Sequence, residues 1–166
     1  MVSLGSTGVG KTTFVHRFLE NTFIEDTDPT IDDAYMKEIT MENTTVKVHI
    51  MDTTGDNEYY ALRDQWIRTG EFFIFFFSLT DHASFEHLDA TVKQVMRLKD
   101  LEGWCPMIMV GCKSDLETER QVTPEMIQLK SMEYNFAYIE TSSKTGTNIQ
   151  AAIEMAINNT KRTIRK

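Results

Sequence analysis

Short apolar segments alternate with amphipathic ones along the chain. The apolar segments that predict strands span residues 1–4, 35–41, 46–52, 72–79, 107–110 and 136–140. Apolar residues at helical spacing predict helices over 11–21, 84–98 and 148–165, with two more around 63–68 and from about 124. This alternation predicts an α/β fold in which helices cover both faces of a mostly parallel, six-stranded sheet.

Several segments carry more specific expectations. The run Phe72–Leu79 has almost no polar residue, so it predicts a strand buried on both faces, and it is far shorter than a membrane-spanning helix. On the helix over 84–98, one face is expected to turn inward; its members are Phe85, Leu88, Val92, Val95 and Met96. The first predicted strand spans only residues 1–4, fewer than a central strand usually has, so either the N-terminus is trimmed or this strand is unusually short.

Composition narrows the class of protein. A chain of 166 residues with 41% hydrophobic and 25% charged residues predicts a single globular domain over residues 1–166. Its net charge of -8 argues against a nucleic-acid partner, because duplex binding depends on basic side chains. Cys105 and Cys112 match neither zinc nor redox spacing, which favours a reduced cytosolic setting. The chain ends without a lipidation signal, so membrane attachment is expected only through a tail beyond Lys166.

The residues Gly5-Ser-Thr-Gly-Val-Gly-Lys-Thr12 match the phosphate-loop pattern, between a strand and a helix. The glycines let successive backbone N–H groups point at a phosphate, and the helix adds its positive N-terminal end. Lys11 is expected to bridge the β- and γ-phosphates, and the Thr12 hydroxyl to bind Mg²⁺. This motif predicts binding of a nucleotide with magnesium.

A second chemical signal follows the strand over 46–52. Asp52 lies at the carboxyl end of that strand, where an open α/β sheet presents its ligands, and it is expected to hold Mg²⁺ directly or through water. Gly55 would let its N–H approach a γ-phosphate. Asp81, His82 and His87 could also form a metal site, but histidines of loops and helices are more often solvated, and we favour that interpretation.

With the phosphate loop, four further motifs resemble the five boxes of Ras-type small GTPases, in the same order. They are Asp28-Pro-Thr-Ile-Asp-Asp-Ala-Tyr35, Asp52-Thr-Thr-Gly55, Cys112-Lys-Ser-Asp115 and Glu140-Thr-Ser-Ser-Lys144. The segment Arg63–Glu71 is more similar to the Ras/Rap branch than to Rab, Rho or Arf. The resemblance covers nearly the whole chain and implies a monomeric GTP/GDP switch.

The resemblance also implies roles for individual residues. Thr30 would bind Mg²⁺ through its hydroxyl, Phe23 would stack on guanine, and Asp115 would accept hydrogen bonds from the guanine N1 and N2 groups. The complete nucleotide set is Gly5, Gly8, Val9, Gly10, Lys11, Thr12, Thr13, Phe23, Thr30, Gly55, Lys113, Asp115, Ser142, Ser143 and Lys144. Metal ligands would be Thr12, Thr30 and Asp52, and catalytic residues Asp56, Thr30, Gly55 and Lys11. Effectors would contact Asp28, Ile31, Asp32 and Asp33, and exchange factors and activating proteins would bind the same switch segments.

Four positions depart from the family. Cys112 stands in place of an asparagine that ties the base loop to the phosphate cradle, so weaker nucleotide binding is expected. Thr7 and Thr54 replace a glycine and an alanine, and Asp56 replaces the glutamine that orients the attacking water. Together these residues predict slow GTP hydrolysis. Rap proteins are a counterexample, because they also lack that glutamine and their activators supply an amide in trans.

Two other classes of protein compete with the slow switch. A GTP-binding module with little or no hydrolysis is favoured by the same departures from the family pattern. A small P-loop kinase would usually need an arginine-rich lid, whereas Arg63 and Arg68 lie in an expected helix. The sequence predicts a cytoplasmic protein, at the cytosolic face of a membrane if the full chain is lipidated.

Overall fold

The computed structural model describes residues 1–25, 32–55, 60–99 and 106–164. Its strands are β1 (Val2–Leu4), β2 (Asp33–Met41), β3 (Thr44–Asp52), β4 (Phe73–Ser78), β5 (Met107–Cys112) and β6 (Ala137–Glu140). Its helices are α1 (Lys11–Glu20), α2 (Tyr60–Thr69), α3 (His82–Glu86), α4 (Leu88–Lys99), α5 (Pro124–Tyr134) and α6 (Ile149–Ile164), with a 3₁₀ turn at Glu117–Glu119.

The strands form one six-stranded sheet in the order β2-β3-β1-β4-β5-β6. Only the β2–β3 pair is antiparallel, so the expected mostly parallel sheet is confirmed. Glu42 and Asn43 form the two-residue hairpin turn between these strands, and both have positive φ, as a turn of type I′ requires. This pairing places β2 at the exposed edge of the sheet.

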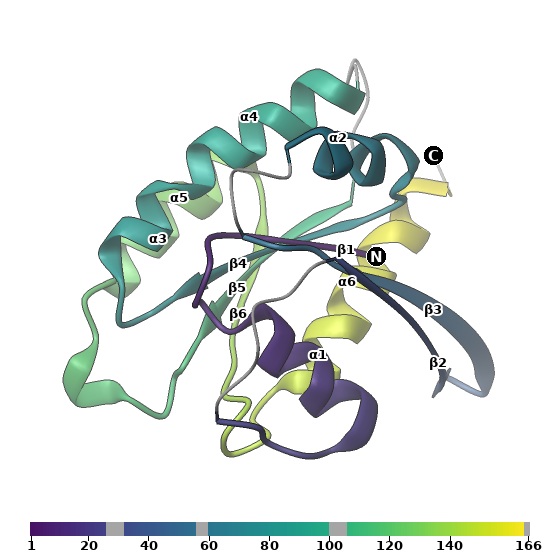
Figure 1. Cartoon of the computed structure of the whole chain (residues 1–166), viewed down its shortest axis with the longest axis horizontal. Coiled ribbons are helices and arrows are strands. Elements are labelled where there is room, and N and C mark those ends of the chain that lie inside the picture. Colours follow the sequence, from purple (N-terminus) through teal and green to yellow (C-terminus); the bar gives the residue numbers. More distant parts are fainter. Residues whose placement is uncertain (26–31, 56–59, 100–105, 165–166) are drawn as a thin grey trace.

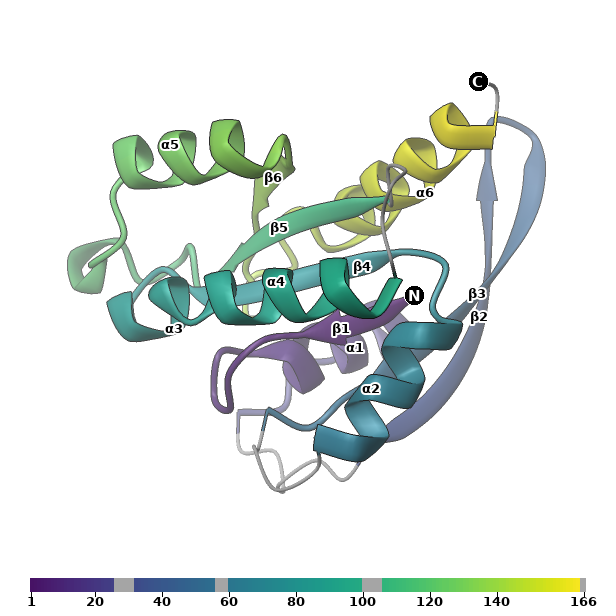
Figure 2. The same ribbon diagram turned by 90° about the horizontal axis from the view of Figure 1, so that it is seen from above.

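Strand β4 divides the protein interior into two layers. Every residue from Phe73 to Ser78 is buried, as predicted for this run. Ile74 and Phe76 pack into a core with α1 and α6, whereas Phe73, Phe75 and Phe77 pack into a second core with α2, α3, α4 and α5. Figures 1 and 2 show these helices on opposite faces of the sheet. Because side chains alternate between the two faces of a strand, phenylalanines of β4 pack against both helical layers.

The region predicted as one helix over 84–98 differs in the structure. It is divided at His87 into α3 and α4, and α3 begins earlier, because the Asp81 carboxylate accepts a hydrogen bond from the Ser84 N–H and caps the helix. Phe85, Leu88, Val92 and Val95 are buried as expected. The inward placement of Met96 was wrong: its side chain is 43% exposed, because it follows Val95 by about 100° around the helix.

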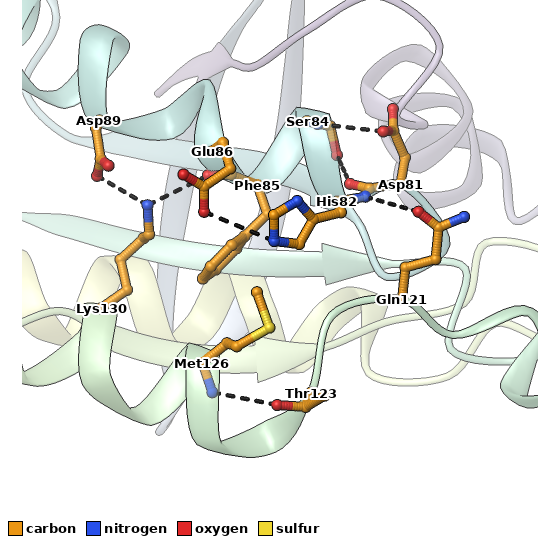
Figure 3. A network of polar contacts seen from close by, with 10 residues as sticks. All are labelled: Asp81, His82, Ser84, Phe85, Glu86, Asp89, Gln121, Thr123, Met126 and Lys130. Carbon is orange, nitrogen blue, oxygen red and sulfur yellow. Dashed lines mark hydrogen bonds and ion pairs between the residues drawn. The ribbon is translucent and has the colours of Figure 1, made fainter.

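Polar contacts join α3 and α4 to α5 (Figure 3). Lys130 is buried, donates a hydrogen bond to Asp89 Oδ1 at 2.8 Å and lies 4.5 Å from the centre of the Phe85 ring. His82 faces Glu86 at 3.8 Å instead of joining Asp81 around a metal ion. Across the described ranges, no cluster of three or more histidine, cysteine or acidic side chains could hold a metal ion.

The remaining strand boundaries shift by a few residues. β2 begins at Asp33, two residues before the apolar pattern starts, because backbone pairing with Asp52 continues into the polar segment. β5 likewise extends to Cys112 through pairing with Ser78. Of the helices described here, none has the length and apolar character needed to cross a bilayer.

The second core provides a matched test of packing. Leu88 on α4 is 1% exposed, whereas Leu129 on α5 is 70% exposed. We expect Leu88→Ala to lower the free energy of unfolding by about 2–5 kcal/mol, since it removes buried methyl groups and leaves a cavity. Leu129→Ala should change it by less than about 0.5 kcal/mol. Urea unfolding followed by circular dichroism measures both, and equal losses would contradict the core assignment.

Candidate nucleotide site

The phosphate loop connects β1 to α1 and depends on glycine backbone geometry. Gly5 has φ +149° and Gly10 has φ +111°, conformations that other residues rarely adopt. A Cβ on Gly5 would lie 2.2 Å from the Phe76 carbonyl oxygen, so the loop leaves the sheet against the β4 backbone. Helix α1 begins directly after Gly10, and Thr12 and Thr13 occupy its first turn. The predicted anion cradle at a helix N-terminus is therefore present.

Lys11 lies beneath this loop. Its Nζ donates hydrogen bonds to the carbonyl oxygens of Gly5 at 2.9 Å and Ser6 at 2.8 Å, and its side chain is buried. Burial lowers the pKa of Lys11 to about 8, although the nearby charge of Asp52 acts in the opposite direction. The loop thus holds a positive charge in a poorly solvated position, where it would attract phosphate oxygens strongly.

Asp52 is completely buried at the end of β3. Its Oδ1 accepts a hydrogen bond from Ser3 Oγ at 3.1 Å, whereas its Oδ2 has no hydrogen-bond partner among the described residues. Burial raises the pKa of Asp52, while Thr12, Lys11 and Ser3 act to lower it. An unpaired, buried carboxylate oxygen beside a threonine hydroxyl is a donor set suited to Mg²⁺, which prefers hard oxygen ligands. These residues therefore fit the predicted metal.

A cavity of about 300 Å³ lies between the phosphate loop and the loops after β5 and β6. Its lining residues are Gly10, Thr13, Phe23, Glu25, Cys112, Lys113, Asp115, Leu116, Ser143 and Lys144. Residues predicted to contact the nucleotide are thus brought together from four separate parts of the chain. The Phe23 ring is 37% exposed and lines the cavity, which fits a stacking surface better than a core residue.

Side-chain contacts fix the carboxylate of Asp115 within this cavity. Ser142 is buried, and its hydroxyl donates a hydrogen bond to Asp115 Oδ1 at 2.6 Å. The same hydroxyl accepts a hydrogen bond from the Thr145 N–H at 3.1 Å. Ser142 therefore supports the loop, as expected, and orients an acceptor that matches the two donors of guanine.

The loop after β5 is tied to the phosphate loop through Lys113. Its Nζ donates a hydrogen bond to the Gly8 carbonyl oxygen at 3.0 Å, and its backbone has φ +64°. Cys112 lies beside Gly10, is buried, and has a pKa raised by burial to about 12, so its thiol is neutral. Lys113 thus makes a tie between the two loops that the resemblance assigned to an asparagine at position 112.

Three cavity residues were absent from the predicted nucleotide set: Glu25, Cys112 and Leu116. Leu116 directly follows Asp115, and an apolar residue at that position could have been predicted to line the cavity. Val9 is buried beneath the loop instead of lining the cavity. Asp28, Thr30, Ile31 and Asp56 lie outside the described residues, so their predicted roles stay predictions.

The segment after Asp52 packs against the phosphate loop. A Cβ on Gly55 would lie 2.2 Å from the Thr7 backbone nitrogen, so only glycine allows this approach. The side chain of Thr7 is exposed, whereas Thr54 is 8% exposed. The two threonines that distinguish this chain thus lie on neighbouring segments at the predicted γ-phosphate position.

Asp32 makes a contact that the sequence did not predict, which we call the Asp32 clasp. Its Oδ1 accepts a hydrogen bond from the Thr54 N–H at 2.7 Å, and its Oδ2 accepts one from the Trp66 indole N–H at 2.9 Å. Arg63 donates a hydrogen bond to the Thr54 carbonyl oxygen at 3.2 Å. Asp32 therefore joins the segment before β2 to the segment after β3 and to helix α2, whereas its neighbour Asp33, also a predicted effector residue, is exposed.

A glycine cradle before a helix, a buried lysine beneath it and a base-sized cavity alongside define a P-loop nucleotide-binding protein. Residues 1–162 match the Ras family. The chain therefore belongs to the Ras family, and it is a GTP-binding small GTPase.

Individual relatives agree with this membership. The Ras-like protein RAS2 of Hydra vulgaris is 40% identical over 152 residues, which cover 92% of this chain and 79% of the relative. Ras-related protein Ral-B of Rattus norvegicus is 40% identical over 149 residues, covering 90% and 72%. Ras-like protein 2 of Drosophila melanogaster is 39% identical over 152 residues, covering 92% and 79%.

The Asp32 clasp predicts a measurable energetic coupling. Asp32→Ala should lower the free energy of unfolding by about 1.5–3 kcal/mol, because it leaves two donors without a charged acceptor. The double variant with Trp66→Phe should lose less than the sum of the single losses, by about 0.5–3 kcal/mol. Denaturant unfolding followed by circular dichroism measures this cycle. The matched control pairs Asp33→Ala with Trp66→Phe, and equal coupling in both cycles would contradict the clasp.

Cys112 predicts faster release of nucleotide than an amide would allow. Cys112→Asn should slow dissociation of GDP about fivefold, since a neutral hydrogen bond contributes on the order of 1 kcal/mol. Release of a fluorescent GDP analogue in the presence of Mg²⁺ measures the rate. Cys112→Ser is the control, because its short side chain keeps the size of cysteine; an unchanged rate in the asparagine variant would contradict the prediction.

Proposed function

We propose that this small GTPase is a slow GTP/GDP switch that uses Mg²⁺ and signals by binding effector proteins. The observation that carries the proposal is the single cavity containing Phe23, Lys113, Asp115 and Ser143, next to the glycine cradle and Lys11. A base and its phosphates would lie in one continuous site. Asp115, oriented by Ser142, supports selection of guanine, since adenine offers no matching pair of donors.

Magnesium would be held by Thr12 and Asp52, with Thr30 as the predicted third protein ligand. When bound there, the ion would neutralise part of the phosphate charge. Asp52 supports this role because its buried Oδ2 is available to a hard cation or its bound water. Lys11 would meet the same phosphates from below the loop. Phosphate would stabilise the charged state of Lys11, which burial disfavours.

Slow hydrolysis follows from the groups expected near the γ-phosphate. An aspartate at position 56 is anionic and has no amide donor, so it would be repelled by the phosphate and could not orient water as glutamine does. Thr7 would also crowd an arginine inserted by an activating protein. The exposed side chain of Thr7 supports this crowding, since Gly55 packs against the Thr7 backbone at the predicted γ-phosphate position.

Effector binding would use the exposed edge strand β2. Its outer backbone groups are available for pairing with a strand of a partner, the mode called β-augmentation. Asp33 is exposed at the start of this strand and would favour a basic partner. Asp32 is engaged by Thr54 and Trp66, so an effector that needs its carboxylate would first have to open the clasp.

A GTP-binding module without turnover is the second candidate. It is favoured by the combination of Thr7, Thr54 and Asp56, and it differs from the slow switch only in the fate of GTP. The kinase alternative is not proposed, because Arg63 lies in helix α2 and contacts the Thr54 carbonyl oxygen. Guanine nucleotide exchange would act as the switch step in either remaining case.

Single-turnover hydrolysis tests the proposal. GTP-loaded protein should release phosphate slowly, and a Thr7→Gly/Asp56→Gln variant should release it at least about tenfold faster, which corresponds to about 1.4 kcal/mol of barrier. Dissociation of GDP from both proteins is the control for altered binding. Equal hydrolysis rates would contradict the assigned cause of slow turnover. Nucleotide that co-purifies separates the candidates: GDP indicates a working timer, GTP a module without turnover, and adenine nucleotides would overturn both.

A further inference from the structure

A second cavity, of about 360 Å³, lies between helices α2 and α4. Its lining residues are Arg63, Asp64, His87, Ala90, Thr91, Lys93, Gln94 and Arg97. The two helices run over the same face of the sheet (Figures 1 and 2). None of these residues lines the base cavity, so the α2–α4 cleft is a separate feature of the surface.

The charge of this cleft is opposite to that of the chain. Arg63, Lys93 and Arg97 carry three positive charges, whereas the protein as a whole has a net charge of -8. The single acid of the lining is Asp64, whose Oδ1 already accepts a hydrogen bond from Gln94 Nε2 at 2.6 Å. Cations concentrated in a concave surface focus the electrostatic potential and attract anions.

Lys93 and Arg97 carry most of the accessible charge. Both side chains are exposed, and they are separated by one turn of α4, where like charges repel each other. Within the described part of the chain, neither forms a hydrogen bond or an ion pair with an acid. Asp89, one turn before Lys93, accepts hydrogen bonds from Lys130 at 2.8 Å and Tyr134 at 3.0 Å, so its carboxylate is engaged by α5 although its charge also acts on Lys93.

We propose that the α2–α4 cleft binds a small anion that carries several phosphate groups. A guanidinium and an ammonium one helical turn apart can each contact a separate phosphate, and Arg97 can do so through two parallel hydrogen bonds. His87 and the small side chain of Ala90 also line the cleft. The cavity is large enough for more than a single carboxylate or phosphate. A soluble inositol phosphate and the headgroup of a phosphoinositide lipid share this chemistry.

Titration with inositol 1,4,5-trisphosphate tests the site directly. The protein is loaded with GDP and Mg²⁺, so that the phosphate loop does not compete, and the salt concentration is near 0.15 M to screen weak surface attraction. We expect saturable binding with a Kd below about 1 mM, and NMR amide shifts that concentrate in residues 87–97. Lys93→Gln/Arg97→Gln should weaken binding at least about tenfold.

The control removes the same charge elsewhere on the surface. Lys47→Gln/Arg68→Gln takes two exposed cations from β3 and from the part of α2 outside the cleft, and it should bind the trisphosphate within about twofold of the unmodified chain. Equal losses in both double variants would show nonspecific attraction and overturn the proposal. Absence of saturable binding to both the soluble probe and vesicles would also overturn it.

Vesicles containing phosphatidylinositol 4,5-bisphosphate form the second arm of the experiment. Sedimentation with these vesicles, reduced by the cleft variant and not by the control variant, would identify a lipid headgroup as the source of the anion. Binding to the trisphosphate alone would identify a soluble anion. Either result supports the site, and neither depends on the rate of GTP hydrolysis.

Discussion

Lys11 and Asp52 are buried at the same edge of the sheet, where each charge offsets part of the desolvation of the other. Their positions follow from the parallel pairing of β1 with β3, which brings the phosphate loop and the end of β3 together. Ser3 on β1 reinforces this arrangement through its hydrogen bond to Asp52. The buried charges of Lys11 and Asp52 compensate each other only in part, and burying them without further partners costs free energy. This edge of the sheet therefore favours a ligand that supplies anionic oxygens to Lys11 and a cation to Asp52. A nucleotide with magnesium has both.

The cavity expected to bind the base and the segment around Thr54 are positioned by different contacts. The cavity is built on loops fixed by short contacts, from Ser142 to Asp115 and from Lys113 to Gly8. The segment around Thr54 is held instead by side chains from two other segments, Asp32 and Arg63. Binding therefore depends on contacts that need no rearrangement, whereas switching can proceed by exchange of a few hydrogen bonds. This division parallels the sequence, in which most of the predicted binding residues fit the family pattern, whereas Cys112 in the base loop and the residues expected near the γ-phosphate depart from it.

Most of the fold could be predicted from periodicity, because β4 is buried on both faces and the other strands repeat an apolar pattern. The start of α3 at His82 could not, since it depends on the cap at Asp81, which lies before the apolar face. Seven of the ten cavity residues were predicted from motifs or from the family resemblance, including Phe23 and Asp115, which lie far apart in the chain. The Asp32 clasp and the tie made by Lys113 were missed, because a single acid or lysine gives no sequence signal for its distant partner. Both depend on tertiary geometry.

Arg63 contacts both the segment after β3 and the α2–α4 cleft. Its guanidinium donates a hydrogen bond to the Thr54 carbonyl oxygen, while the same side chain lines the α2–α4 cleft. An anion in the cleft and a phosphate near Gly55 would therefore act on one peptide unit from opposite sides. If either ligand changes the position of Arg63, the other must bind with altered affinity, since thermodynamic coupling is reciprocal. Helix α2 would then transmit the effect through the contact between Arg63 and the Thr54 carbonyl oxygen.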